Sequence, residues 1–261
     1  MKKKNLLIST ICIGAFTLLY TILVAFVDKQ AIGPNSSSVG FALLNNSFME
    51  LIGENGTFYT ITKYTGILII LIALAYIILA IVQWSKRKSF KEIDTNLIIF
   101  SIFCVGLALI YLFFEVVKVN YRPILIDGKL EASYPSSHTM LAVFICVSTA
   151  IINHKLIKNK DIRTIVSTLI LCLGAITIIG RIASGVHWIT DIIGAILIST
   201  TLVLGYCLTL EFLNKKQQTS TMTQTDNNEI VVEKKVEKEK TTKSSDKANN
   251  KKKKIADPET K

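Results

Sequence analysis

Two polar segments of this sequence carry arginine and histidine next to apolar runs. The first segment contains Tyr121-Arg122-Pro123 and ends on Pro135-Ser136-Ser137-His138. The second contains Arg181, then His187 and, four residues later, Asp191. Ionisable groups at the ends of membrane-spanning runs are costly unless they have a task or a partner. These residues are therefore the candidates for chemistry.

Each segment has a recognisable chemical pattern. On a helix, His187 and Asp191 would lie on one face, one turn apart. An aspartate that hydrogen-bonds one imidazole nitrogen leaves the other nitrogen free as a nucleophile. Pro135 followed by Ser136 and Ser137 is typical of a helix start, whose amides favour an anion. Taken singly, each segment also fits a structural role, an interfacial His–Asp pair or a capped helix with a chance histidine.

Taken together, the two segments supply what phosphoryl transfer needs. That reaction requires an in-line nucleophile, positive charge for the equatorial oxygens and a proton for the leaving group. His187 can attack with Asp191 as its partner, and His138 can protonate the leaving oxygen. Arg122 and Arg181 can bind phosphate oxygens in a fork. Because no Asp, Glu, His or Cys cluster has metal-ligand spacing, the sequence predicts chemistry without a metal or another cofactor.

The elements that must position these residues are apolar runs. The chain has 261 residues, 50% of them hydrophobic, and a mean hydropathy of +0.45, which is more apolar than usual for a soluble domain. A helix needs about 20 apolar residues to cross a membrane. The sequence predicts an all-α, six-helix membrane bundle with these spans: Leu6–Val27, Thr65–Trp84, Leu97–Val117, Pro135–Ile157 around the short run Thr139–Ile152, Ile162–Ile179 and Trp188–Leu213.

Two connections between the spans have local patterns of their own. In residues 28–64, Gly33-Pro34-Asn35-Ser36 predicts a turn. Apolar residues recur at helical spacing in residues 41–52 and predict a short interfacial helix. Asp127-Gly128, between short apolar runs, predicts a tight hairpin that returns the chain toward His138.

Basic clusters orient the predicted spans. The positive-inside rule places such clusters in the cytoplasm, and here they are Lys2–Lys4, Lys86–Lys91, Lys155–Arg163 and Lys215–Lys216. We expect a multi-pass cell-membrane protein with both termini cytoplasmic and an extracellular active site. The spanning length of the first run favours an uncleaved helix over a signal peptide. The net charge of +11 lies in these clusters and the C-terminal segment, which argues against a nucleic-acid partner.

The predicted domain organisation is simple. Residues 1–213 form the membrane domain, and residues 214–261 form a disordered, lysine-rich cytoplasmic tail. Weak attraction of this tail to anionic lipid is an open alternative to a purely solvated role. The five cysteines all lie within apolar runs and are interpreted as small buried hydrophobic residues. The expected partners are the bilayer and a substrate; the sequence leaves the oligomeric state undetermined.

The combined pattern resembles the type 2 phosphatidic acid phosphatase superfamily of integral-membrane lipid phosphate phosphatases. The family pattern is Lys-x6-Arg-Pro, then Pro-Ser-Gly-His, then Ser-Arg-x5-His-x3-Asp. This sequence has Arg122-Pro123, Pro135-Ser136-Ser137-His138 and Arg181-x5-His187-x3-Asp191 in the same order. The likeness covers roughly residues 6–213, because the family also has six spans.

The resemblance implies a metal-independent phosphatase that acts through a phosphohistidine at His187, with Asp191 as its partner and His138 as the general acid. The residues that would hold phosphate are Arg122, Arg181, Ser136, Ser137 and Lys118. The implied substrate is a lipid phosphate or pyrophosphate, of the undecaprenyl pyrophosphate, phosphatidylglycerophosphate or phosphatidic acid type. Two alternatives stay open: a lipid phosphotransferase that uses the same histidine, and a catalytically impaired lipid-phosphate-binding membrane protein.

Three positions depart from the family pattern. Gly180 replaces a serine, and Ser137 replaces a glycine. The third departure changes charge, because the position of the phosphate-binding lysine holds Glu115. Lys118 lies about one helical turn further on and could supply the missing charge. Alternatively, Glu115 and Lys118 pair with each other.

Overall fold

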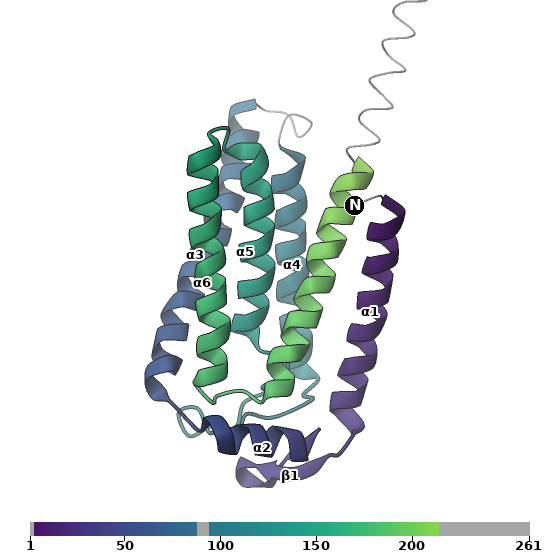
Figure 1. The fold of residues 1–261 in the computed structure, drawn as a ribbon, viewed down its shortest axis with the longest axis vertical. Helices are drawn as coiled ribbons and strands as arrows, with labels where there is room; N and C mark the ends of the chain where they lie inside the picture. Colours follow the sequence, from purple (N-terminus) through teal and green to yellow (C-terminus); the bar gives the residue numbers. More distant parts are fainter. Residues whose placement is uncertain (1–2, 88–93, 214–261) are drawn as a thin grey trace, which may run out of the picture. The chain divides into compact units, whose positions relative to one another are not determined.

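The computed structural model describes residues 3–87 and 94–213. Within these ranges, six helices are long and apolar enough to cross a membrane. This confirms the predicted six-helix membrane fold. The helices are arranged as a bundle (Figure 1) and comprise α1 (Lys3–Phe26), α3 (Gly56–Arg87), α4 (Thr95–Val116), α5 (Ser137–Leu156), α6 (Lys160–Ala183) and a last helix, Ile189–Leu213.

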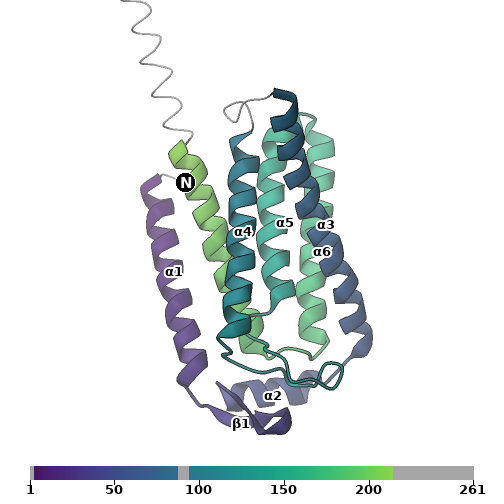
Figure 2. The ribbon, with the colours of Figure 1, turned by 180° about the vertical axis from the view of Figure 1, so that it is seen from behind.

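Helix α5 lies at the centre of the bundle. It packs against α3, α4 and α6 (Figures 1 and 2), and it is the most buried of the six spans. Its polar residues Thr149 and Asn153 are buried; Thr149 Oγ1 donates to the Ile145 carbonyl at 2.7 Å, and Asn153 Nδ2 donates to Ser167 Oγ at 3.2 Å. A helix covered by protein can carry satisfied polar groups where a lipid-facing helix cannot. This explains why the apolar run of the fourth span is short.

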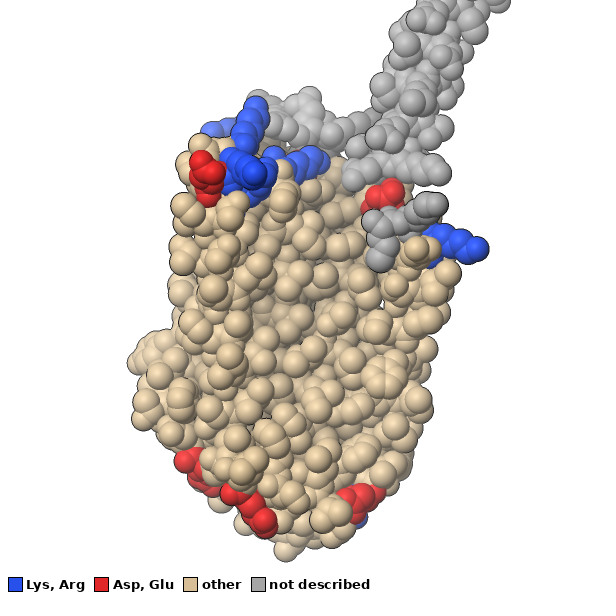
Figure 3. All heavy atoms as spheres, viewed as in Figure 1, with Lys and Arg blue, Asp and Glu red and all other residues tan. Residues whose placement is uncertain are grey.

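The other helices expose apolar side chains on their outer faces. Ile11 on α1, Leu109 on α4 and Leu169 on α6 are each more than 60% exposed. On the face shown in Figure 3, the charged side chains gather toward the two ends, and the band between them is free of Lys, Arg, Asp and Glu. Both features fit a hydrocarbon surrounding. The side of the membrane on which each end lies stays a prediction.

The connection between α1 and α3 forms a small layer beneath the bundle (Figure 1). It comprises β1 (Gln30–Gly33), a 3-10 turn (Pro34–Ser36), β2 (Ser37–Val39) and α2 (Ala42–Ile52). The predicted turn and the predicted short helix are confirmed; the interfacial position of that helix stays a prediction. The antiparallel pairing of β1 with β2 was not predicted.

Asn45 attaches this layer to the last helix. Its side-chain Nδ2 donates to the Gly40 carbonyl at 2.7 Å and to Thr190 Oγ1 at 3.0 Å. Its Oδ1 accepts from the Thr190 backbone N–H at 3.3 Å. The whole side chain is buried. Asn45 therefore links α2 to the start of the last helix, where the candidate site lies.

Two helix boundaries differ from the sequence prediction. Helix α3 begins at Gly56 rather than near Thr65, because Asn55 Oδ1 accepts from the N–H groups of Thr57 and Phe58 and caps the helix. The polar residues in its first turns lowered the hydropathy there. Helix α6 continues to Ala183, so that Arg181 lies in its last turn rather than in a connecting segment.

Residues 214–261, the predicted cytoplasmic tail, lie outside the described residues. The boundary predicted at residue 213 and the disorder predicted beyond it therefore stay predictions.

Replacing Asn45 by alanine should destabilise the fold. The change leaves buried groups of Gly40 and Thr190 without their partners, which costs about 1–3 kcal/mol. Thermal unfolding in detergent should show a lower unfolding temperature for Asn45→Ala. The neighbouring Asn46→Ala is the matched control, because Asn46 is exposed and its side chain donates to Glu50 on the same helix. Equal unfolding temperatures for the two variants would contradict the anchoring role of Asn45.

Candidate active site

The predicted hairpin brings Arg122 to the start of α5. Ile126 and Lys129 exchange both backbone hydrogen bonds, at 3.0 and 2.9 Å. Between them, Asp127 and Gly128 have φ values of 49° and 74°, as a tight primed turn requires. The hairpin is thus confirmed. Further back along it, the Arg122 N–H donates to the Glu131 carbonyl at 3.1 Å.

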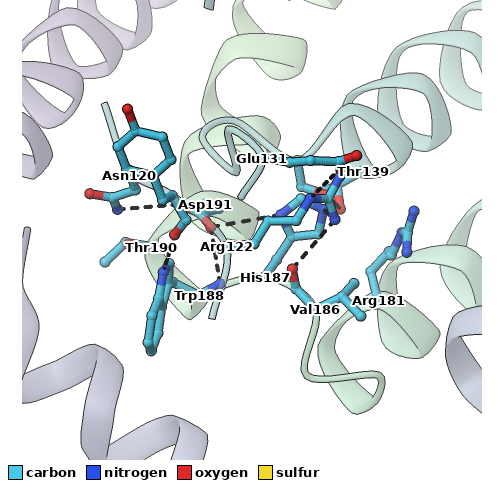
Figure 4. Close-up of polar contacts among 12 residues, drawn as sticks. Asn120, Arg122, Glu131, Thr139, Arg181, Val186, His187, Trp188, Thr190 and Asp191 are labelled. Atoms are coloured by element: carbon cyan, nitrogen blue, oxygen red, sulfur yellow. Dashed lines mark hydrogen bonds and ion pairs between the residues drawn. The ribbon is translucent and has the colours of Figure 1, made fainter. Parts of the chain in front are cut away.

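The Arg122 side chain reaches His187 (Figure 4). Its Nη1 lies 3.4 Å from His187 Nε2 and 3.5 Å from the Val186 carbonyl oxygen. On the other side of the guanidinium, Nε lies 3.1 Å from Glu131 Oε2, an ion pair without hydrogen-bond alignment. A guanidinium can only donate. His187 Nε2 therefore faces Arg122 with its lone pair.

A tight turn presents His187 just before the last helix. Gly185 in this turn has a φ of 65°, and a side chain there would also collide with the backbone of Gly53. The last helix begins at Ile189. The premise that His187 and Asp191 share a helical face is therefore wrong, because His187 precedes the helix.

Asp191 belongs to the first turn of the last helix, and its carboxylate lies next to the His187 ring. Its Oδ2 accepts from the Trp188 backbone N–H at 3.0 Å, the reach-back bond of a helix start. The same oxygen lies 3.7 Å from His187 Nδ1, too far for a hydrogen bond. The structure thus brings the pair together and directs Nδ1 toward the carboxylate, but the predicted hydrogen bond is not formed.

Asn120 is a site residue that sequence reasoning missed. Its side chain is fully buried; Nδ2 donates to Asp191 Oδ1 at 3.3 Å, and Oδ1 accepts from the Gly40 N–H at 2.9 Å. It therefore holds the carboxylate of Asp191 against the layer that contains α2. A lone asparagine in a loop carries no sequence signal for such a role.

Arg181 and His138 form a second buried pair. Arg181 Nη2 lies 2.6 Å from His138 Nδ1, and the Tyr59 ring lies 5.4 Å from the guanidinium carbon. Arg181 is only 2% exposed, yet its Nε and Nη1 have no hydrogen-bond partner. Buried donors are rarely left unpaired. An anion bound here would satisfy them.

Two residues of α3 also shape this pair. Tyr59 lies in the first turns of the helix, which the sequence analysis assigned to a connection. Gly66 lies inside the predicted span Thr65–Trp84, and a Cβ placed there would lie 2.8 Å from His138 Nε2. A glycine at this point of α3 is therefore what leaves room for the His138 ring.

The start of α5 is where the sequence predicted it, with one local difference. Ser136 occupies the cap position, but its side chain makes no capping bond and accepts instead from Thr139 Oγ1 at 3.0 Å. The first amides of a helix have no partner within it. Ser137, the first residue of α5, lines the adjacent cavity. The predicted contacts of Ser136 and Ser137 with phosphate stay predictions.

Two cavities meet at this point. A polar cavity of about 280 Å³ is lined by Arg122, His187 and Ser137, among other residues. An apolar cavity of about 600 Å³ lies between α3, α4 and α5 and is lined in part by His138. Ser137 and Tyr111 line both. The two histidines therefore face different but adjoining spaces.

Glu115 and Lys118 both line the polar cavity. Lys118 Nζ lies 5.7 Å from the centre of the Tyr121 ring. Among residues 3–87 and 94–213, no ion pair joins Glu115 to Lys118. Lys118 is thus placed where it could contact a phosphate, and its role stays a prediction.

The surroundings of His187 hold its ring neutral. Burial is the largest cause that lowers its pKa well below the ordinary value of 6.5, followed by the positive charges of Arg122 and Arg181 and by His138. A contact with the Ser133 backbone opposes this shift. A neutral imidazole, with one nitrogen unprotonated, is the form that can act as a nucleophile. In the part of the chain that the structure describes, no three His, Cys, Asp or Glu residues are grouped to hold a metal ion.

Comparison with known families agrees with this geometry. The family model described as the PAP2 superfamily matches residues 113–215. The matched PAP2 segment contains all five residues of the two pairs just described, Arg122, His138, Arg181, His187 and Asp191. The resemblance inferred from the motifs is confirmed.

One similar structure is described as the first transmembrane PAP2 type phosphatidylglycerolphosphate phosphatase from Bacillus subtilis. It is 16% identical, with a TM-score of 0.49, and the alignment covers 79% of this chain and 96% of that one. No curated protein matches the chain.

The unpaired donors of Arg181 predict an anion site. Inorganic phosphate should raise the unfolding temperature of the purified protein in detergent, because a ligand that binds only the folded state stabilises it. Arg181→Gln should remove most of this rise. Arg163→Gln, on the same helix but at its opposite end, should keep it. An equal rise in the Arg181 variant would contradict the assignment.

Proposed function

We propose that this chain is a membrane lipid phosphate phosphatase that acts without a metal through a phosphohistidine at His187. One observation carries the proposal: neutral His187 directs Nε2 toward Arg122 inside a polar cavity, with Asp191 behind Nδ1. The PAP2 match supports a phosphatase at family level. We further propose that the site lies on the extracellular side, as the distribution of Lys and Arg favours.

The first step would form the phosphohistidine. The lone pair on His187 Nε2 attacks phosphorus, and a P–N bond forms as the P–O bond to the lipid breaks. The bonding electrons leave with the lipid oxygen, which takes a proton from His138 and departs as an alcohol. Arg122 and Arg181 stabilise the charge on the equatorial oxygens. Asp191 stabilises the positive charge that His187 acquires.

The second step would release phosphate. Water attacks phosphorus, His138 takes the proton of that water, and the P–N bond breaks with its electrons returning to His187 Nε2. One lipid phosphate and one water thus give one lipid alcohol and one inorganic phosphate. Both histidines return to their starting states.

Phosphate binding would prepare His138 for this role. Since Arg181 can only donate, His138 Nδ1 accepts from it, so that a neutral ring carries its proton on Nε2. A general acid needs a second proton on the ring. When phosphate binds the Arg181 donors, Nδ1 is released from the guanidinium and can take up that proton.

The adjoining apolar cavity supports a lipid as the leaving group. The oxygen that His138 protonates is the one that carries the rest of the substrate. His138 lines the apolar cavity together with Ile67, Leu107 and Met140. A hydrocarbon chain attached to the leaving oxygen can occupy this space, whereas a polar group would lose its hydration there.

His187→Ala should abolish phosphate release from lipid phosphates in detergent, measured with a chelator present. Removing a covalent nucleophile typically costs several orders of magnitude in kcat. The matched control is His154→Ala, because His154 is the remaining histidine of the chain and lies in the last turn of α5, at the end of that helix away from His138. Phosphate release by the His187 variant at the wild-type rate would overturn the proposal, as would phosphate release that requires added divalent metal.

Transfer of phosphate to a second lipid in place of release would favour the phosphotransferase.

Lys118→Ala should lower kcat/KM for a lipid phosphate by about tenfold, the size of one lost charge-assisted hydrogen bond. Lys118 supplies positive charge in the polar cavity, whereas the family position for that charge holds Glu115. Lys129→Ala is the control, since Lys129 is exposed at the hairpin tip. Near-normal turnover by the Lys118 variant would rule out this compensation.

A further inference from the structure

The polar cavity has an unusual charge balance for a site that would hold phosphate. The residues with formal charge that line it are two cations, Lys118 and Arg122, and two carboxylates, Glu115 and Glu131; His187 lines it as well. His187 is neutral, because burial and the neighbouring arginines lower its pKa. The formal charges of the two cations and the two carboxylates therefore cancel.

The two carboxylates come from different elements. Glu115 lies in the last turn of α4, and Glu131 follows the hairpin turn, with its side chain 44% exposed. Both line the same cavity as His187. A phosphate at His187 therefore shares its cavity with two carboxylates from different elements.

The cations of the cavity are already partly engaged. Glu131 Oε2 lies 3.1 Å from Nε of Arg122, so only the Nη side of the guanidinium faces His187. Lys118 Nζ lies 5.7 Å from the centre of the Tyr121 ring, within cation–π range. Together with Arg181, the Nη side of Arg122 suits the oxygens of one phosphoryl group. Within residues 3–87 and 94–213, Arg122 is the arginine that lines the polar cavity; Arg181 lies beside His138.

A lipid diphosphate would place a second phosphate on the leaving-group side of the reacting one, where the polar cavity adjoins the apolar cavity at Tyr111 and Ser137. Tyr111 interacts with Glu115 and Glu131, so the added negative charge would lie near both carboxylates. Like charges at short range and reduced dielectric repel strongly. A monoester avoids this repulsion, because its next atoms after the reacting phosphate are an ester oxygen and carbon.

We propose that Glu115 and Glu131 make this site selective for lipid phosphate monoesters over lipid diphosphates. The inference rests on the proposed function and narrows its substrate class. Glu115 is the more diagnostic of the two, since Glu131 also holds Arg122 and its loss would disturb both substrates.

The test compares farnesyl phosphate with farnesyl diphosphate, which share one tail and differ by one phosphate. The full-length protein in detergent should hydrolyse the monophosphate with at least about tenfold higher kcat/KM, the effect of roughly one pKa unit of charge interaction. Glu115→Gln should reduce this preference severalfold, mainly through faster diphosphate hydrolysis, and Glu115→Lys should reduce it further. Glu50→Gln is the control, because Glu50 is exposed on α2 at the same end of the bundle.

The outcomes separate the two proposals. Equal kcat/KM for the two substrates in the wild type, or an unchanged preference in Glu115→Gln, would overturn the selectivity while His187-dependent hydrolysis stands. A preference that shifts equally in Glu50→Gln would overturn it as well, because the effect would then come from charge at a distance. No release from either substrate by the folded wild-type protein would overturn the proposed function, and the selectivity with it.

Discussion

The buried carboxylate of Asp191 is the constraint on which the rest of the site depends. It is fully inaccessible to solvent, so its oxygens must find partners within the protein. Trp188 and Asn120 supply two of them, and the His187 ring lies against the same group. Asn120 in turn bonds Gly40. The carboxylate therefore ties together the start of the last helix, the loop after α4 and the layer that contains α2.

The same burial governs the charges around it. Arg181 is held inside the bundle with two donors unpaired, and Arg122 directs Nη1 at His187. These positive charges and the burial keep His187 neutral. Placing uncompensated donors in the interior costs stability, which an anion restores. In the proposed function, phosphate is the anion that pairs these donors, and positive groups placed in advance are what electrostatic catalysis of phosphoryl transfer requires.

The sequence predicted the fold and the pairing of polar segments well, because apolar runs and positive charge report directly on membrane-spanning helices. It also predicted the hairpin at Asp127-Gly128, since that turn needs those residue types. It placed the start of α3 too late and the end of α6 too early, because polar residues that face a site lower the hydropathy of a helix end. For the same reason it missed Tyr59. Gly66 lies inside a predicted span, and its role was missed because it depends on a tertiary contact with His138. Asn120 was missed because its role depends only on tertiary contacts.

The central claim is that His187 is the covalent nucleophile, and trapping its phosphorylated form tests this most directly. The protein would be mixed with a lipid phosphate labelled in the phosphoryl group and quenched in alkaline detergent within one turnover. The account predicts a labelled protein whose label resists alkali, is lost in acid and maps to the peptide that contains His187. It also predicts no label in His187→Ala and normal labelling in His154→Ala. Phosphate release by the wild type with no labelled protein at any time, or a label on another residue, would contradict it.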